Sequence, residues 1–462
     1  MNKSKLFYFV VLMLFTVSIK AQSDSICINK AKQSLNWLNN NESVKLYNEF
    51  DKTVAAKISA EETATIWKQI ISQVGDFVEV DTLITNTSSG NLIVDQVLKF
   101  EKTYLKYRLS FDDDNKISGI FFIPYKTAQA AAESTKTFDE IKCSFVNEGI
   151  EFPAIYCTPK NQKTQAVVIL VHGSGPNDMD ETIGPNKIFK QIANKLASYG
   201  IASLRYDKRS YFAQQGMVDE AIKTDINSIV VSDAIAAANY ISRVDSLEYL
   251  PRILVGHSLG GYMAPQIAMQ SSSIDAIVML AANARPLEDL IIEQYRYLYA
   301  RDGMTKVEKK AICKMKRKVK NVKKLEKYVA RGKTVELPLV NDVDFWLSLN
   351  KYDPLTTINN LQMPILIIQG RRDYQVSEKE DFLLWKSNSK QSISKDKSFL
   401  LYYGLNHLFI KGNGNSYPEE YNKKGNVSDN MIKDMADWIK SIWNKKYNEP
   451  KLQRNIVHLR HG

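Results

Sequence analysis

The chain has 462 residues, of which 44% are hydrophobic and 24% are charged. This composition excludes a low-complexity chain, and at roughly 100–200 residues per domain the length predicts two or three domains. The formal net charge is +11, and residues 301–333 carry 14 Lys or Arg against 3 Asp or Glu. Nucleic-acid-binding surfaces usually interleave cations with aromatic side chains, and this segment has only Tyr328, so we expect no nucleic-acid partner. We interpret the segment as a solvated helical face; the alternative is steering of anionic substrates or contact with an anionic surface.

Residues 1–21 have the pattern of a secretory signal peptide. Lys3 and Lys5 precede the apolar run 6–15, and the small residue Ala21 stands before the expected cleavage point. The run is shorter than the roughly 20 apolar residues that span a bilayer, and no later segment is long and apolar enough to do so. We therefore expect a secreted or periplasmic protein with no integral membrane segment after signal removal. An uncleaved N-terminal anchor is the alternative.

Residues 24–125 are predicted to form a small α+β domain. Apolar residues recur every three or four positions over 28–75, which indicates helices. From residue 77 the period changes to two, and runs separated by turn residues predict strands. These runs cover residues 77–85, 91–100, 103–111 and 117–125. The small and polar stretch that follows, 126–138, is interpreted as a linker.

From residue 139 to 448 the pattern is that of an α/β domain, with a polar tail over 449–462. An opening hairpin is followed by apolar strands that alternate with helices, which predicts a doubly wound, mostly parallel sheet with helices on both faces. These strand runs cover residues 165–172, 201–206, 252–257, 276–282, 363–370 and 398–403. About 80 mostly helical residues separate the fourth run from the fifth. We expect an insertion there, with a lid at about 285–352 over the carboxyl ends of the strands.

The four cysteines, Cys27, Cys143, Cys157 and Cys313, are scattered along the chain. No C-x-x-C pair or Cys/His cluster has the spacing of a metal site. We therefore expect free or buried thiols and no metal ion.

The stretch VGHSLGG, residues 255–261, places Ser258 between a predicted strand and a predicted helix. Its three glycines leave room for a tight turn and for close approach of the helix to the strand. Such a turn exposes a serine hydroxyl above the sheet and directs the next backbone N–H, that of Leu259, toward the reacting carbonyl. A G-x-S-x-G match also occurs in ordinary glycine-rich turns, so the partners of Ser258 decide whether it is a nucleophile.

Among the five histidines, His407 is the best-placed general base because it follows the last predicted strand. His257 stands beside Ser258 on an extended strand, where adjacent side chains point apart. His172 is expected to shape a loop, and the other two histidines lie in the polar tail. Asp373 directly follows a buried strand, where loops collect functional groups, and is the predicted acid that orients the base.

The stretch HGSGPNDMDETIGPN, residues 172–186, follows a buried strand and is called the oxyanion loop below. Its glycines allow the backbone to approach a substrate closely. We expect the N–H of Ser174 and the N–H of Leu259 to form the pair of oxyanion donors.

The order HGSG, GHSLGG, GRRDYQV and LNH resembles the α/β-hydrolase superfamily over roughly residues 139–448. The phrases HGSGPNDMDETIGPNKIF and LRYDKRSYF are similar to a secreted bacterial branch described as serine-aminopeptidase-like or esterase-like. In that branch a small domain of uncharacterised function, of the nuclear-transport-factor-2-like α+β kind, often precedes the hydrolase, and residues 28–125 look similar.

This resemblance implies roles for five residues. Ser258 is the expected nucleophile, His407 the general base and acid, Asp373 the residue that orients the histidine, and Ser174 and Leu259 the oxyanion donors. The resemblance implies no metal and no organic cofactor.

The expected reaction is acyl transfer to water, and the favoured substrate is a carboxylic ester with a small or medium acyl group. The first alternative is an exopeptidase, which needs an acid to hold the free amine of its substrate. Asp178, Asp180 or Glu181 could supply that acid, unless they are solvated or paired with Lys187 and Arg209. The second alternative is a binding protein that keeps the fold without turnover, against which the complete triad argues. The sequence leaves the oligomeric state open.

Overall fold

The computed structural model describes residues 25–88, 91–125, 133–214, 223–244, 247, 249–301, 303–339, 342–389, 393–394 and 396–448. The predicted signal peptide, the predicted tail and residues 126–132 of the predicted linker lie outside the described residues. The described chain forms two compact units, one over 25–125 and the other over 133–448.

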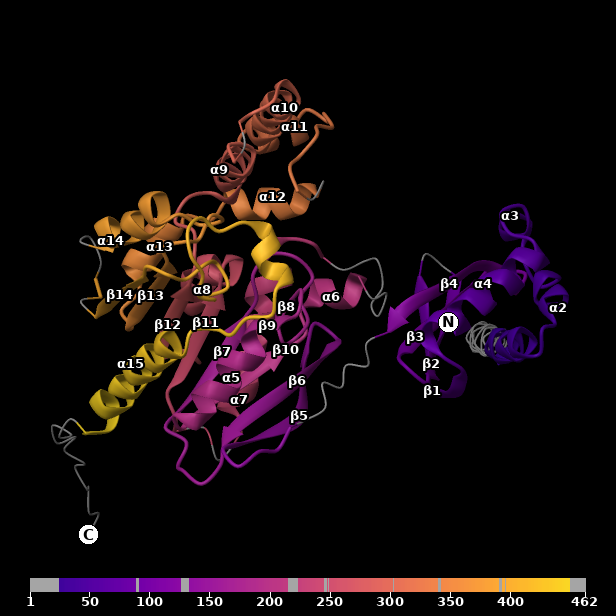
Figure 1. Ribbon diagram of the computed structural model, residues 1–462, viewed down its shortest axis with the longest axis horizontal. Coiled ribbons are helices and arrows are strands. Elements are labelled where there is room, and N and C mark those ends of the chain that lie inside the picture. Colours follow the sequence, from indigo (N-terminus) through magenta and orange to yellow (C-terminus); the bar gives the residue numbers. More distant parts are fainter. Residues whose placement is uncertain are drawn as a thin grey trace, which may run out of the picture. The chain divides into compact units, whose positions relative to one another are not determined.

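The first unit has the predicted α+β character, with helices followed by an antiparallel sheet (Figure 1). Its helices cover residues 25–39, α2 (Ser43–Tyr47), α3 (Lys52–Ala55) and α4 (Ala60–Val74). Its sheet has the order β1 (Phe77–Ser88), β2 (Asn91–Phe100), β3 (Tyr104–Phe111) and β4 (Ile117–Tyr125).

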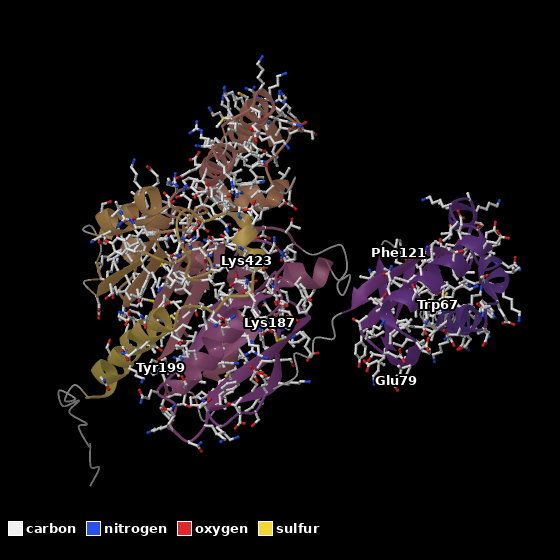
Figure 2. All side chains as sticks on the ribbon, in the orientation of Figure 1. Trp67, Glu79, Phe121, Lys187, Tyr199 and Lys423 are labelled. Atoms are coloured by element: carbon white, nitrogen blue, oxygen red, sulfur yellow. The ribbon has the colours of Figure 1, made fainter. Side chains whose placement is uncertain are left out.

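The helix α4 closes one face of this sheet. It begins with a capping box in which the Ser59 hydroxyl accepts from the Glu62 N–H and the Glu62 carboxylate accepts from the Ser59 N–H. Trp67, labelled in Figure 2, projects from α4, and its ring centroid lies 5.9 Å from that of Phe100 and 5.5 Å from that of Phe122. The unit therefore has a hydrophobic core of its own.

The second unit is built on a sheet of eight strands. The order across the sheet is β14-β13-β12-β11-β7-β10-β6-β5. The two strands at one edge pair as an antiparallel hairpin, β6 pairs antiparallel with β10, and the remaining neighbours are parallel. The strands are β5 (Phe138–Asn147), β6 (Ile150–Pro159), β7 (Ala166–Val171), β10 (Ile201–Tyr206), β11 (Arg252–His257), β12 (Ala276–Leu280), β13 (Ile365–Gly370) and β14 (Lys397–Tyr402).

Helices cover both faces of this sheet, which confirms the predicted doubly wound fold. β7, β10, β12 and β13 are buried along their whole length, because helices exclude water from both of their faces. The helices α5 (Ile188–Ser198) and α15 (Asp429–Asn448) share one hydrophobic cluster with the sheet. The helices α7 (Asp233–Ser242) and α8 (Leu259–Gln270) cover the opposite face.

Short elements complete the frame of the second unit. They are β8 (Thr182–Ile183), β9 (Asn186–Lys187), α6 (Arg209–Gln214), η2 (Glu378–Phe382), α14 (Leu383–Asn388) and η4 (Pro418–Asn422). One helix departs from regular α-helical form: it begins as a π-helix, η1 (Asn227–Ser232), and continues as α7.

A helical insertion separates β12 from β13, as the sequence pattern predicts. It consists of α9 (Leu287–Tyr299), α10 (Lys306–Val322), α11 (Leu325–Val329), α12 (Val343–Asn350) and α13 (Pro354–Asn360). α10 and α11 stand away from the sheet (Figure 1). α10 buries Ile312, Val319 and Val322 and leaves most of its cations exposed. Among the described residues no helix combines the length and the apolar character needed to cross a membrane.

Candidate active site

Ser258 occupies the sharp turn between β11 and α8. Its φ of +52° lies in the left-handed region, which is strained for a residue with a side chain. Two backbone hydrogen bonds hold the turn: the Ser258 N–H donates to the Leu280 carbonyl at 2.8 Å, and the Ser258 carbonyl accepts from the Tyr262 N–H at 2.8 Å. The strain is concentrated at the residue predicted to be the nucleophile.

Two glycines make this turn sterically possible. A Cβ atom at Gly256 would lie 2.3 Å from the Gly260 carbonyl oxygen. A Cβ atom at Gly260 would lie 2.2 Å from the Val171 carbonyl oxygen on the neighbouring strand. Both distances are shorter than real Cβ contacts, so any side chain there would push α8 away from β11 and β7.

The predicted base and acid are in direct contact. His407 Nδ1 lies 2.7 Å from Asp373 Oδ2, and both side chains are buried. The other carboxylate oxygen, Oδ1, accepts from the N–H groups of Gln375 and Val376 at 2.8 and 3.0 Å. Since an ionised carboxylate can only accept, Nδ1 carries the proton and Nε2 remains for the nucleophile. Ser258 and His407 line the same cavity.

The predicted oxyanion donors also border this cavity. Ser174 lies in the oxyanion loop and Leu259 is the first residue of α8, and both line the cavity beside Ser258. The neighbouring Gly173 N–H is engaged, because it donates to Glu181 Oε1 at 2.7 Å. The assignment of Ser174 and Leu259 as the two donors remains a prediction.

The cavity has a volume of ≈ 230 Å³. Aliphatic side chains from the insertion form much of its wall, and amides provide most of its other polar groups. The aliphatic members are Ile183, Leu259, Leu287, Leu290, Ile291, Leu339 and Val376, and the amides are Asn177, Asn283, Gln294 and Gln375. The insertion thus contributes apolar side chains to the wall of the cavity that contains Ser258.

Two of the three acids considered for amine recognition are engaged within the oxyanion loop and its neighbours. Asp178 accepts from the N–H and the hydroxyl of Thr182. Asp180 pairs with Lys187 at 2.9 Å, as considered from the sequence, and with Arg205 at 2.9 Å. Arg209 does not join them.

Arg209 pairs instead with Asp233 and Glu148, each at 2.6 Å. Of the two cations that the sequence offered as partners for these acids, Lys187 is one and Arg209 is not. Arg205 takes that place because it lies on β10, directly beside the loop.

The third acid, Glu181, forms a contact that the sequence did not indicate. Its Oε1 lies 3.0 Å from His257 Nδ1, and His257 Nε2 lies 3.0 Å from the His407 carbonyl oxygen. His257 therefore points away from Ser258, as expected for adjacent residues on a strand. A histidine before the nucleophile and a glutamate in the oxyanion loop are too common in sequences to predict this pairing.

The remaining histidines have other environments. The His172 ring is buried against Phe189 and Tyr206, and burial lowers its pKa to about 4. His172 is thus a neutral part of the loop's support, as predicted. His458 and His461 lie outside the described residues. Within the described residues no three His, Cys, Asp or Glu side chains gather closely enough to hold a metal ion.

Comparison with known proteins connects these features to a family. Residues 162–413 match the family described as serine aminopeptidase, S33, and residues 31–120 match a family of proteins of unknown function, DUF3887. Esterase EstD of Thermotoga maritima is 34% identical over 394 residues, which cover 84% of this chain and 89% of that protein.

Solved structures that resemble the second unit include two esterases. The esterase domain of a Rhodothermus marinus protein is 18% identical, with a TM-score of 0.40, and the match covers 65% of this chain and 98% of that one. Est1E from Butyrivibrio proteoclasticus is 15% identical, with a TM-score of 0.40, and the match covers 67% of this chain and 99% of that one. A DUF3887 domain precedes the hydrolase domain in this chain. From the match over residues 162–413 and the long alignment with EstD, we conclude that the chain belongs to the S33 serine aminopeptidase family of α/β-hydrolases.

Proposed function

We propose that this protein is a secreted or periplasmic serine hydrolase that cleaves carboxylic esters with small or medium acyl groups. The observation that carries the proposal is the arrangement of three side chains. Ser258 and His407 line one cavity, and Asp373 binds the far nitrogen of the histidine at 2.7 Å. The relationship to esterase EstD supports an ester as the substrate. The localisation rests on the sequence pattern of residues 1–21.

In this mechanism the Ser258 hydroxyl oxygen attacks the carbonyl carbon while His407 Nε2 takes its proton. The N–H groups of Ser174 and Leu259 stabilise the negative oxygen of the tetrahedral intermediate. His407 then gives the proton to the departing alkoxide, the C–O bond breaks, and an acyl-enzyme remains. Water attacks the acyl-enzyme with help from His407, which releases the carboxylic acid and restores the serine. Asp373 stabilises the imidazolium in both steps.

An ester is favoured over a peptide because the three acids considered for amine binding are all engaged by other groups of the protein. Asp178 and Asp180 bind their own neighbours. Glu181 Oε1 binds Gly173 and His257, and Glu181 Oε2 is enclosed within the protein. An exopeptidase of this fold would need such an acid open to the cavity. The cavity of ≈ 230 Å³ with aliphatic walls supports a small or medium acyl group.

The test compares two substrate series on purified protein that lacks residues 1–21. One series is p-nitrophenyl esters from acetyl to octanoyl, and the other is aminoacyl-p-nitroanilides. The key variant is Ser258→Ala, and the matched control is Ser387→Ala, which removes an exposed hydroxyl on α14. We expect wild type and the Ser387 variant to hydrolyse short esters, and the Ser258 variant to lose roughly 10⁴-fold or more in kcat.

Two results would contradict the proposal. Serine-dependent cleavage of anilides that requires a free amine would assign the protein as an exopeptidase. An absence of serine-dependent turnover in both series would contradict the general esterase and point to a binding role.

A further inference from the structure

Glu181 and His257 form a buried pair in the wall of the cavity that holds Ser258 and His407. The two residues are 1% and 2% exposed, and Glu181 Oε1 lies 3.0 Å from His257 Nδ1. They belong to different parts of the fold, since Glu181 lies in the oxyanion loop and His257 ends β11. The mechanism described above uses neither side chain.

The hydrogen-bond partners determine the charge of this pair. His257 Nε2 faces the His407 backbone carbonyl at 3.0 Å, and a carbonyl oxygen only accepts, so Nε2 carries a proton. Glu181 Oε1 also accepts from the Gly173 N–H at 2.7 Å, as an ionised carboxylate does. With Glu181 ionised, as a glutamate ordinarily is at neutral pH, His257 Nδ1 donates to it and the ring carries two protons as an imidazolium.

The electrostatics of the surroundings agree with this assignment. Burial by itself would lower the pKa of His257, but the Glu181 carboxylate and the hydrogen bonds raise the pKa above its ordinary value. Burial by itself would raise the pKa of Glu181, but His257 holds it below its ordinary value. Other titratable groups also face the pair, namely His172, Lys208, Asp373 and the base His407.

The protein maintains this arrangement at an energetic cost. Glu181 has φ +48°, a left-handed conformation that is strained for a residue with a side chain. Its second oxygen, Oε2, is buried without a hydrogen-bond partner among the described residues. Such strain persists only where the surrounding structure holds the residue in place. Strained residues of this kind are common at functional sites.

We propose that Glu181 and His257 are positioning residues that join the three catalytic segments. Through Gly173 the carboxylate fixes the oxyanion loop, so that the next N–H, that of Ser174, faces the substrate. The imidazolium donates from Nε2 to the His407 carbonyl and so fixes the backbone of His407. His257 also directly precedes Ser258 in the chain. This inference rests on the proposed ester hydrolysis, and it adds two residues that shape the transition-state site without touching the substrate.

The first test measures steady-state kinetics of Glu181→Gln and His257→Gln on a p-nitrophenyl ester. We expect kcat to fall roughly 10- to 100-fold with KM changed less than about threefold, a smaller loss than that of a whole oxyanion donor. Because the contacts act on the transition state, kcat and kcat/KM should fall together. The control is Asp233→Asn, which weakens another buried pair of the same unit, with Arg209 at 2.6 Å. Thermal unfolding of all variants separates lost stability from lost rate, and we expect the control to lose stability but keep kcat.

The second test reads the charge of His257 directly. In protein with ¹⁵N-labelled histidine, the His257 resonances are identified by their loss in His257→Gln. We expect both ring nitrogens to be protonated at pH 7.5 in wild type and one nitrogen to be deprotonated in Glu181→Gln.

Three outcomes would overturn the inference: a neutral His257 in wild type, a kcat within about twofold of wild type in both pair variants, or an equal fall of kcat in the Asp233 control. A failure of the proposed function would give a different result. The wild-type protein would then hydrolyse no ester, while His257 would still carry two protons. That result would remove the catalytic role of the pair together with the proposed function.

Discussion

Asp207 and Lys208, at the end of β10, connect that strand to the oxyanion loop. Asp207 Oδ1 accepts from the Met179 N–H at 2.7 Å, and Lys208 Nζ donates to the Gly173 carbonyl at 2.7 Å. Burial raises the pKa of Asp207 to about 7 and lowers the pKa of Lys208 to about 8. The loop that carries the predicted oxyanion donor thus rests on groups that titrate near neutral pH.

Asp207 gives a prediction about stability and pH. Its folded pKa lies above its ordinary value, so the folded state binds the proton more tightly than the unfolded state. The stability that this group contributes is present at low pH and is lost as pH rises from about 4 through about 7. Asp207→Asn keeps an acceptor for Met179 without the charge, so we expect it to be more stable than wild type by about 1–3 kcal/mol at pH 8.

Urea unfolding of both proteins between pH 4 and pH 8 measures this difference. The two stabilities should converge near pH 4. Parallel pH curves for the two proteins would show that Asp207 is ionised throughout and would contradict the prediction.

At the scale of elements, a buried carboxylate binds the base of the helical insertion. Asp381, in η2, accepts from the N–H groups of Ala284 and Arg285 and from the guanidinium of Arg285. Its side chain is fully buried. The residues that it binds lead directly into α9, whose side chains wall the cavity.

We expect Asp381→Ala to destabilise the protein by about 3–5 kcal/mol, because it leaves a partly buried guanidinium and two backbone donors without their acceptor. The matched control is Glu293→Ala. Glu293 pairs with the same guanidinium at 2.5 Å but is half-exposed, so its removal should cost no more than about 1 kcal/mol. Denaturant unfolding compares the two variants. Equal losses would show that Asp381 acts as an ordinary surface partner.

The elements of the second unit differ in how well the sequence predicts them. The strands were predictable because continuous apolar runs bounded by glycine and polar residues match strands buried on both faces. The π-helical starts at Asn227–Ser232 and Glu378–Phe382 could not be predicted, because their hydrophobic spacing resembles that of an α-helix. Their extra residue per turn depends on the packing around them.

At the scale of the whole molecule, the two units have separate hydrophobic cores. One core is built around Trp67 and Phe100, and the other unites the sheet with α5 and α15. Domains with independent cores generally unfold as independent cooperative units.

We therefore expect two unfolding transitions in calorimetry. A fluorophosphonate that attaches to Ser258 should shift only the transition of residues 133–448, because the reagent is bound covalently to a residue of that unit. Ser258→Ala treated with the same reagent should show no shift. A single transition that moves as a whole would contradict the independence of the two units.

The sequence alone was sufficient for the fold class, and it nominated the residues of the candidate site. The glycines around Ser258 and the positions of Asp373 and His407 just after strands follow from local chain geometry, and parallel strands bring their carboxyl ends together. Only the tertiary structure decided which charges meet. Glu181 and His257 are 76 residues apart in the chain, and Arg285 and Asp381 are 96 apart. Asp180 pairs with Arg205 and not with Arg209 for the same reason, because the tertiary structure brings Arg205 beside it. Periodicity records which side of an element is buried, whereas a pairing of buried charges depends on where distant elements lie in space.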